Sequence, residues 1–509
     1  MVVKTMNEWA RKKIGDHMDH STLNNNVRTF DVVVVGCGVA ALCAAVAAAE
    51  AGAKVAVLER STFEERGGNT RYTTAALRMK SEEEVSEDFI QSFVDHSGYH
   101  IQPDFIESTV LDYENWPSTV KSGNFTDPEI ISFFADNCPI AIQWLKQCGV
   151  KFGGIGFYGV TARSSPRIAI TGGGLHLIEV MTDYAKEKGV TFFFETSAQS
   201  LVQDFTGAIS GVYAYQKTIG GAQFNAPSVI LACGGFQGNP EMVVRYLGPK
   251  GRYLRPVALG GYFNKGEGIE MALRIGASPA GDFAEYHAEP IDPRSANTEP
   301  LIMAYPYGVL VNSLGLRFID EAPGPIDASY EATTRIIAEQ KQGIAFCILD
   351  NKINNIDNWK RCVRSDIAPV SAPSIDALGK ALGFDGARAA QSINEYNLSC
   401  GNGVFNPYIL DGLSTEGISP RKSNYAIPLD TAPFHAYPII SSNTFTFGGL
   451  KVNTNCQVIS KDGDVLPGLY AAGETVGLYY GKYPGATSVL RGAVFGKRAG
   501  EHAGSATKN

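Results

Sequence analysis

The sequence predicts an α/β fold built on a parallel sheet, and three segments of the 509-residue chain support this. The stretch DVVVVGCGVAA, residues 31–41, places four valines before a glycine turn and the start of a helix. The stretch PGLYAAGETVG, residues 467–477, is a second apolar strand, and PGATSVLRGAVFGKRAGEHA then predicts a turn and a helix of small residues. Uninterrupted β-branched runs are typical of strands that a parallel sheet buries on both faces.

The first of these strands opens a complete β-α-β unit. An alanine-rich helix follows the turn, ends at Gly52, and leads into a second strand that stops at Glu59. In this pattern Gly36 permits a tight turn, Gly38 lets the backbone approach a pyrophosphate, and Ala41 allows close helix–strand packing. Glu59 stands at the distance expected for an acid that binds a ribose hydroxyl. The unit is therefore Rossmann-like and predicts a bound dinucleotide, either FAD or NAD.

Composition excludes several classes of function. The formal net charge of −8 gives no broad cationic field for nucleic acid or an anionic membrane surface. The nine cysteines include no C-x-x-C pair, so we expect no zinc, iron–sulfur or haem site and no other metal. The first 28 residues are polar, and no long apolar run follows them. We expect a soluble, cytoplasmic protein with no membrane span.

Several further motifs carry a resemblance to a known family. They are RGGNTRYTTAA (66–76), TGGGLHLIEVMTDYAKEKGVTFFFETSAQSLVQD (171–204), VILACGGFQGN (229–239), NKGEGIEMALRIGA (264–277), GVLVNSLGLRFIDE (308–321) and FGGLKVN (447–453). In this order they resemble the flavoproteins that include fumarate reductases, succinate dehydrogenases and 3-ketosteroid dehydrogenases. Within that family the chain looks most like the tricarballylate dehydrogenases, which oxidise a tricarboxylic acid to cis-aconitate. The resemblance implies that the dinucleotide is FAD.

The resemblance also implies a domain organisation, in which an α+β capping domain is inserted into the Rossmann-like FAD-binding domain. Pro-rich stretches such as EAPGPID and IPLDTAPFHAYP agree with chain crossings between two units. The expected segments are a polar extension at 1–28, FAD-binding domain at 29–284, cap at 285–429, and FAD-binding domain again at 430–509.

The family pattern assigns a set of cofactor-binding positions to this sequence. The set is Gly36, Gly38, Val39, Ala40, Ala41, Glu59, Arg60, Gly67, Gly68, Asn69, Thr70, Thr74, Ala198, Ala232, Cys233, Gly234, Glu267, Gly473, Glu474, Ser488 and Val489. Within it, Glu474 is expected at the ribityl hydroxyls and Ser488-Val489 at the pyrimidine edge of the flavin. Tyr72 stands where succinate dehydrogenases carry the histidine that tethers FAD, so we expect non-covalent FAD.

The substrate positions depart from the fumarate reductase pattern. Pro325 stands where the arginine acid is expected, and Tyr483 replaces a carboxylate-binding arginine. Thr444 and Phe445 occupy the place of a carboxylate-binding histidine, whereas His287 in EYHAEP is retained. We therefore expect fumarate reduction to be lost, because the proton donor and the cationic clamps for two carboxylates are missing.

The leading hypothesis is an FAD-dependent oxidoreductase that forms, or reduces, a C=C bond beside a carboxylate or carbonyl group of a small molecule. The candidate catalytic residues are His287, Tyr305 and Tyr483, and a tyrosine or His287 would serve as base. Electrons would pass to a separate acceptor, which could be a partner protein, a quinone or oxygen. An alkene isomerase or tailoring enzyme with no net redox change is the alternative, and a redox sensor or electron-carrier subunit is a third possibility.

Overall fold

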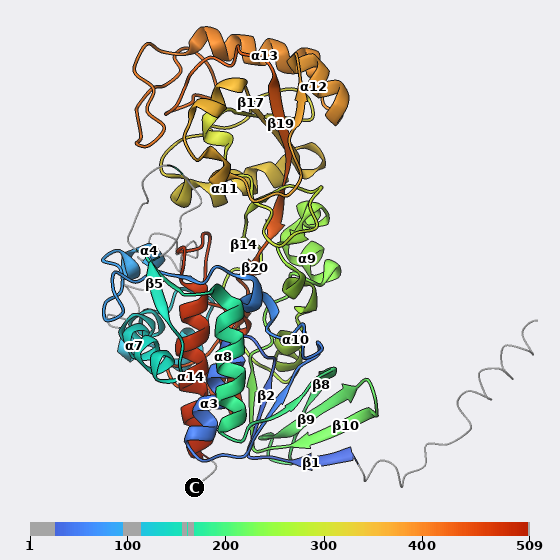
Figure 1. Ribbon diagram of the computed structural model, residues 1–509. Coiled ribbons are helices and arrows are strands. Elements are labelled where there is room, and N and C mark those ends of the chain that lie inside the picture. The colour runs from blue at the N-terminus through green and yellow to red at the C-terminus, as the bar shows by residue number, and fades with distance from the viewer. Residues whose placement is uncertain (1–25, 95–112, 155–159, 161–166, 507–509) are drawn as a thin grey trace, which may run out of the picture.

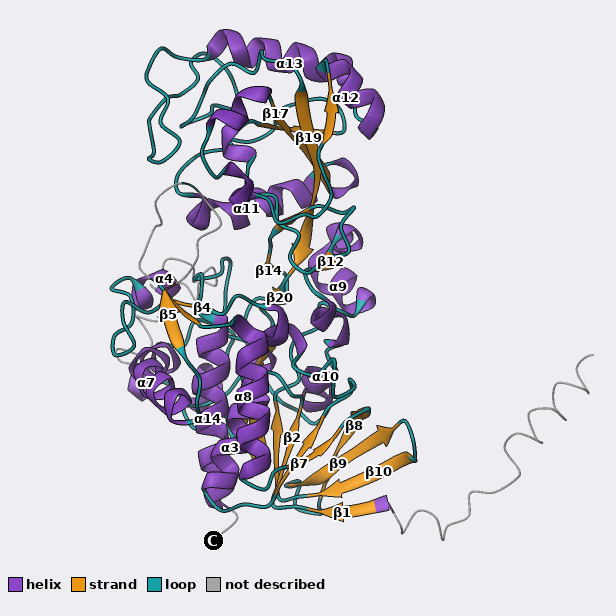
Figure 2. Ribbon diagram, viewed as in Figure 1, coloured by secondary structure: helices purple, strands orange, loops and turns teal. Residues whose placement is uncertain are grey.

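The computed structural model describes residues 26–94, 113–154, 160 and 167–506. A lower body contains the parallel sheet with its helices, and an upper body carries residues from the middle of the sequence (Figure 1). Figure 2 shows that both bodies contain helices and strands. No helix among the described residues is long and apolar enough to cross a membrane.

The central sheet of the lower body follows the predicted Rossmann-like pattern. Its strands, in spatial order, are β22 (Gln457–Ile459), β23 (Val465–Ala471), β11 (Ser228–Leu231), β2 (Val32–Val35), β3 (Val55–Leu58) and β7 (Thr191–Phe193). All neighbours from β23 to β7 run parallel, and only β22 is antiparallel. The four valines of β2 are buried because β3 and β11 flank them and helices cover the sheet. The predicted α/β class is confirmed.

Three long helices form a layer beside this sheet (Figure 1): α3 (Val39–Glu50), α8 (Gly173–Glu187) and α14 (Ser488–Ala506). Helix α3 starts directly after the Gly36 turn, as its sequence predicted, and α14 packs along it. Helix α7 (Pro128–Gln147) packs on the outer side of α14. The first helix of the β-α-β unit thus packs against a helix from a distant part of the sequence.

Shorter elements complete the lower body. A four-stranded sheet contains, in spatial order, β1 (Val27–Thr29), β10 (Gly220–Asn225), β9 (Ile209–Gln216) and β8 (Thr196–Gln203). Two smaller sheets are β4 (Ala76–Leu77), β6 (Ile168–Ile170) and β5 (Phe152–Gly154), and the pair β13 (Pro279–Ala280) and β21 (Gly449–Leu450). The shorter helices are α4 (Phe89–Val94), α6 (Ser118–Lys121), α9 (Pro240–Leu247) and α10 (Glu267–Arg274). The 3₁₀ segment η2 (Gly68–Tyr72) packs against α8.

The upper body is built on a mixed, mainly antiparallel sheet. Its strands are β12 (Arg255–Pro256), β15 (Pro290–Ile291), β16 (Val309–Asn312), β17 (Ile344–Leu349), β18 (Val370–Ala372) and β19 (Phe434–Asn443), and its helices are α11 (Ile326–Glu339), α12 (Ile375–Leu382) and α13 (Gly386–Ser399). Strand β19 pairs with β12, β15, β17 and β18. The sheet of the cap therefore reaches residue 443, beyond the expected boundary at 430, and we propose to place the second crossing after β19.

Helix α11 lies on the side of the cap that faces the lower body (Figure 1). Next to it the short pair β14 (Tyr286–His287) and β20 (Phe445–Thr446) brings the two crossings of the chain together. His287 is placed opposite Phe445 in this pair. The substrate positions named from the sequence are thus gathered where the two bodies meet.

Candidate active site

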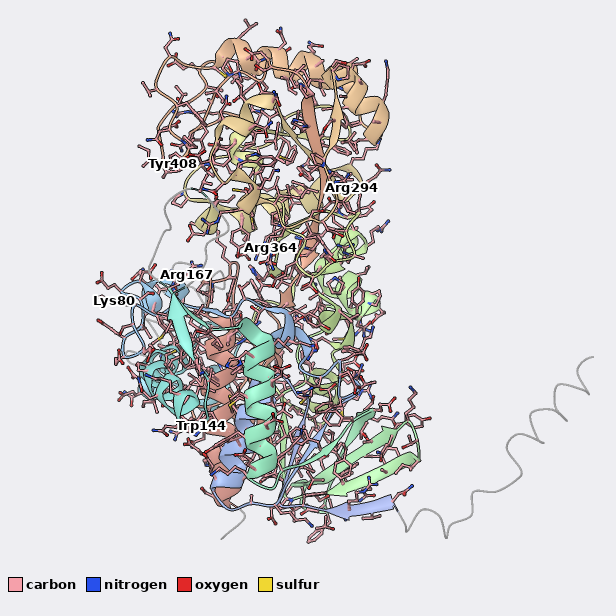
Figure 3. The ribbon with its side chains drawn as sticks, in the orientation of Figure 1. Lys80, Trp144, Arg167, Arg294, Arg364 and Tyr408 are labelled. Carbon is pink, nitrogen blue, oxygen red and sulfur yellow. The ribbon has the colours of Figure 1, made fainter. Side chains whose placement is uncertain are left out.

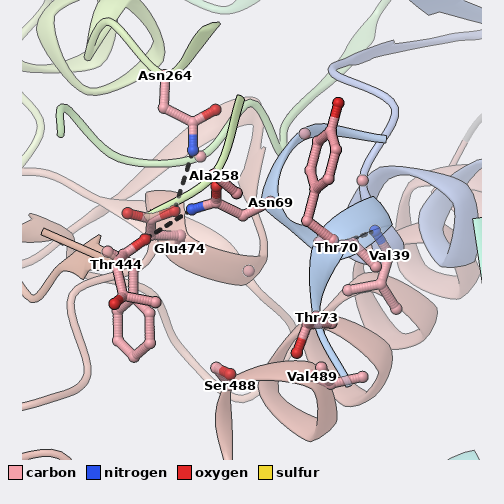
Figure 4. A pocket seen from close by; sticks show the side chains of 18 of the residues that line it. Val39, Asn69, Thr70, Thr73, Ala258, Asn264, Thr444, Glu474, Ser488 and Val489 are labelled. Carbon is pink, nitrogen blue, oxygen red and sulfur yellow. Dashed lines mark hydrogen bonds between the residues drawn. The ribbon is translucent and has the colours of Figure 1, made fainter. Parts of the chain in front are cut away.

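One large cavity runs from the carboxyl ends of β2 and β3 to the underside of the cap. Residues of β2, the start of α3, η2, β8, the start of α14 and the cap segment 285–429 line it. Figure 4 shows the lower part of this cavity, with Thr70, Asn264, Glu474 and Ser488 around it. Ligands of open α/β sheets bind at this edge, where the strands end.

The turn before α3 is shaped as a cradle for phosphate. Gly36 has a φ of +110°, and a Cβ atom there would lie 2.4 Å from the carbonyl oxygen of Ala232. Gly38 caps α3 with no side-chain acceptor, and no acidic residue lies in the first turn. The backbone N–H of Val39 donates to Thr70 Oγ1 at 3.2 Å, and residues 36–40 of the turn line the cavity. Such a helix start favours an anion such as a pyrophosphate.

The outer end of the cavity carries charged groups. Glu59 is buried and accepts a hydrogen bond from the Ser61 backbone N–H at 2.7 Å. Burial raises the pKa of Glu59, although the hydrogen bonds from Ser61 oppose the shift. Arg60 forms an ion pair with Glu267 close by. These groups lie where the β-α-β pattern predicts the adenosine ribose.

A second polar cluster surrounds Glu474. Its carboxylate accepts hydrogen bonds from the Thr446 backbone N–H at 2.9 Å and from the side-chain amides of Asn264 and Gln237, each at 3.3 Å. Burial raises the pKa of Glu474, and these hydrogen bonds work against that shift. Asn69 donates to the Thr444 carbonyl at 2.7 Å, as the dashed lines of Figure 4 show for the residues drawn, but its buried Oδ1 has no partner. An unpaired acceptor on the cavity wall fits a ligand rich in hydroxyl groups, such as the ribityl chain of FAD.

Tyr483 holds the start of α14. Its hydroxyl oxygen accepts hydrogen bonds from the backbone N–H groups of Thr487 and Ser488, both at 2.9 Å. Its ring lies 4.5 Å from the His287 ring, centroid to centroid. The tyrosine that replaces an expected arginine thus connects the helix start to the histidine retained at the start of the cap.

His287 lies between two carboxylates. Its Nε2 is 3.7 Å from Glu289 Oε1 and its Nδ1 is 3.9 Å from Glu331 Oε1. The Tyr330 hydroxyl lies 3.4 Å from the same Nε2. Burial alone would lower the pKa of His287, but Glu289 and Glu331 together outweigh it and raise the pKa to about 9. The imidazole is therefore cationic at neutral pH.

The cap side of the cavity is acidic and apolar. The described residues that segment 285–429 contributes to the lining are His287, Glu289, Glu299, Leu301, Met303, Ile326, Asp327 and Tyr330. Arg167, from the lower body, lies 3.6 Å from Asp327, and Glu299 is paired with Arg364. Figure 3 shows Arg167 and Arg364 at the level where the two bodies meet. In the described part of this lining, segment 285–429 supplies no arginine or lysine.

The structure gathers most of the residues named from the sequence into this one cavity. Every cofactor position except Ala41 lines it, and Ala41 is instead buried within α3. His287 and Tyr483 line its cap end. Tyr305 does not, because its side chain is fully buried in the hydrophobic core of the cap. Cys233 is partly buried, and desolvation raises the pKa of its thiol to about 11, which favours the protonated form at neutral pH.

The sequence reasoning missed Tyr330 and the two glutamates beside His287. Tyr330 and Glu331 belong to SYEATTR, in which Glu331 and Arg335 form an i,i+4 ion pair along α11. This spacing is visible in the sequence and predicts that Glu331 and Arg335 share one helix face. It does not tell which distant residue that face meets.

The parallel sheet, the phosphate cradle and the polar walls define an FAD-dependent oxidoreductase. A model of the FAD binding domain family matches residues 31–490, and the chain belongs to this family. It is 27% identical to the vinyl phenol reductase of Lactiplantibacillus plantarum, over 94% of this chain and 97% of that protein. It is 25% identical to a cytochrome-type fumarate reductase of Shewanella frigidimarina, over 94% of this chain and 78% of that protein.

Among solved structures, the open conformation of a flavocytochrome c3 fumarate reductase has a TM-score of 0.73 at 22% identity, covering 97% of this chain and 82% of that one. This likeness supports the fold. The cofactor expected from the sequence, FAD, is confirmed by the family. The roles of individual residues around it stay predictions.

Proposed function

We propose that the protein reduces a C=C bond that is conjugated to an uncharged activating group, such as a phenol ring or a ketone. The observation that carries this proposal is the cap lining, where three carboxylates, three apolar side chains, His287 and Tyr330 face the substrate end of the cavity. A dicarboxylate needs cationic partners for both ends, and each extra negative charge would meet Glu289, Glu299 or Asp327.

The relatives support the reaction class and its direction. The names vinyl phenol reductase and fumarate reductase both describe reduction of a C=C bond, and the first describes an uncharged substrate. At two of the positions where the sequence departs from the fumarate reductase pattern, Pro325 is the N-cap residue of α11 and Tyr483 accepts hydrogen bonds from backbone N–H groups. Neither side chain carries the positive charge with which an arginine would hold a carboxylate.

Bound FAD would supply a hydride to the alkene. Gly38, Thr70 and Asn69 would hold the cofactor from below, while Leu301 and Met303 of the cap would cover the substrate and exclude water. A proton must reach the neighbouring carbon, and His287 and Tyr330 are two groups at the cap end that hold protons. Electrons would come from a separate two-electron donor, such as a reduced flavin or a quinol.

Oxidation of a tricarboxylate, as in the tricarballylate dehydrogenases, is the second candidate. It is favoured by the motif similarity and by Arg167, which lines the cavity. Segment 285–429 contributes no further arginine or lysine to the described lining that could bind a substrate with three negative charges. We therefore rank a tricarboxylate below an uncharged alkene as the candidate substrate. An isomerase without net redox change remains the alternative in which His287 and Tyr330 move protons alone.

Anaerobic reoxidation of the reduced enzyme tests the proposal. The protein is reduced with dithionite and mixed with 4-vinylphenol, cyclohex-2-enone or fumarate, and the flavin absorbance is followed. We expect an uncharged alkene to restore the oxidised spectrum and fumarate to do so at least a hundredfold more slowly. Rapid reoxidation by fumarate would show that the assignments of Pro325 and Tyr483 are wrong. Bleaching of the oxidised enzyme by tricarballylate would favour the second candidate, and product without any flavin change would favour the isomerase.

A further inference from the structure

We propose that the Tyr330 hydroxyl donates the proton in alkene reduction and that His287 restores it. This inference rests on the proposed function. It assigns the acid to a side chain of α11 that lies five residues after Pro325, the position at which the family pattern expects an arginine.

Tyr330 is placed to reach a substrate. It lines the cavity, is only partly buried, and its hydroxyl lies 3.4 Å from His287 Nε2. The two rings meet edge to face, with centroids 5.8 Å apart. Burial raises the pKa of Tyr330 well above its usual value, and Glu289 and Glu331 add to the shift. The hydroxyl therefore keeps its proton at neutral pH, as an acid must and a base must not.

His287 is surrounded by groups that hold a proton on it. The polar neighbours of its imidazole are Glu289, which follows on the same crossing, and Glu331 and Tyr330 of α11. The rings of Phe445, from β20, and Tyr483, from the segment before α14, pack against the imidazole. Arg335 forms ion pairs with Glu331 and, at 2.9 Å, with Glu285. Arg335 is thus a positioning residue, because it fixes the carboxylate of Glu331 beside the imidazole.

Tyr483 is a weaker candidate for the acid. Its hydroxyl oxygen already accepts two backbone N–H groups, so its place is tied to the start of α14. No comparable backbone contact holds the hydroxyl of Tyr330 within the described residues, where His287 Nε2 is the partner that the structure gives it. Tyr330 is therefore the hydroxyl that can turn toward a substrate.

The step balances in atoms and charge. The alkene takes up a hydride at one carbon and the Tyr330 proton at its neighbour, so one saturated product and one tyrosinate result. The imidazolium of His287 then gives its Nε2 proton to the tyrosinate, which leaves neutral Tyr330 and neutral His287. A proton from the solvent then returns to His287, beside Glu289 at the cavity wall, so that each turnover consumes one hydride and one solvent proton.

Stopped-flow reoxidation separates this role from a structural one. With the alkene that reoxidises the wild-type enzyme fastest, Tyr330→Phe should lower the limiting rate about a hundredfold while the half-saturating concentration changes little. The matched control is Tyr437→Phe, because Tyr437 lies in the cap core and not in the cavity lining. An unchanged limiting rate in Tyr330→Phe would overturn the proposal. If no alkene reoxidises the wild-type enzyme, the proposed function fails first.

The pH profile gives a second readout. The limiting rate of the wild-type enzyme should stay level and fall above about pH 9, where His287 loses the proton that it returns to Tyr330. In Tyr330→Phe this fall should disappear. Nitrogen-15 NMR of labelled histidine, assigned with His287→Gln, should show an imidazolium at pH 7. A neutral imidazole at that pH would overturn the role of His287 without any substrate being present.

Discussion

Single glycines decide whether the cofactor cradle is intact, and the two glycines of the first turn do so in different ways. Gly36 adopts a φ of +110° against the carbonyl oxygen of Ala232, so it is needed for the backbone itself. Gly38 has a φ of −76°, which any residue can adopt, and a Cβ there would point toward Thr70 Oγ1 at 3.3 Å. Gly38 is therefore needed for the space that it leaves empty.

We expect Gly38→Val to fold and to lose FAD, because the new side chain enters the phosphate cradle without straining the backbone. Gly36→Ala should instead unfold at a lower temperature, because its Cβ collides with backbone. Flavin absorbance of the purified proteins and thermal unfolding check both results. A Gly38→Val protein with full flavin occupancy would contradict the placement of the pyrophosphate at this turn.

At the scale of secondary-structure elements, the packing of α3 against α14 shapes the cofactor cradle. Gly492, Gly496, Gly500 and Gly504 recur every four residues on α14 and lie against α3. A Cβ at Gly496 would lie 2.3 Å from the Ala40 carbonyl oxygen, and one at Gly500 would lie 2.2 Å from that of Ala44. The two backbones approach this closely because alanines face glycines.

We expect Gly496→Val to lower the free energy of unfolding by about 1–3 kcal/mol, the usual cost of overpacking. Because Ala40 lines the cavity, the same change should also weaken FAD binding. Ser505→Ala, an exposed position on the same helix, is the control and should change neither quantity. Denaturant unfolding and flavin titration measure the two effects. Unchanged FAD affinity would mean that α14 does not hold the cradle in place.

The sequence predicted these elements because their signals are local. The valine run, the Gly36 turn and the alanine-rich segment lie within one β-α-β unit, and its helix and strands have the expected places. The spacing of the α14 glycines is also visible, but a single sequence does not tell which helix fills the groove. Tyr330 was missed for the same reason, since its partner His287 lies on another element.

The whole molecule is organised around one cavity with a cap and a base. Strand β19 belongs to the cap sheet, and the residue after it, Thr444, accepts a hydrogen bond from Asn69 of the cofactor cradle. Arg335 of the cap donates hydrogen bonds to the carbonyl oxygens of Tyr286, on the first crossing, and of Gly481, in the segment before α14. The cofactor therefore lies against contacts that join the two bodies, and its binding should stabilise both.

We expect FAD to be non-covalent and to stabilise the whole chain. Tyr72 lines the cavity where a tethering histidine would stand, so acid precipitation should release the yellow cofactor into the supernatant. Protein stripped of FAD should unfold at a lower temperature, and added FAD should restore the unfolding temperature by mass action. At a free FAD concentration of a hundred times the dissociation constant, the free energy of unfolding should rise by about 2.7 kcal/mol. Flavin that stays with the denatured protein would show a covalent link.

The order of strands in the central sheet also has a consequence for biosynthesis. Strand β2 and the Gly36 turn are synthesised before β23, Glu474 and the start of α14, although β2 and β23 flank the same strand, β11. A nascent chain that stops before α14 has the Gly36 turn but lacks the α14 residues that line the cofactor cavity. We expect FAD to bind only after the start of α14 has been synthesised, because the Gly36 turn forms only part of the cofactor site without it.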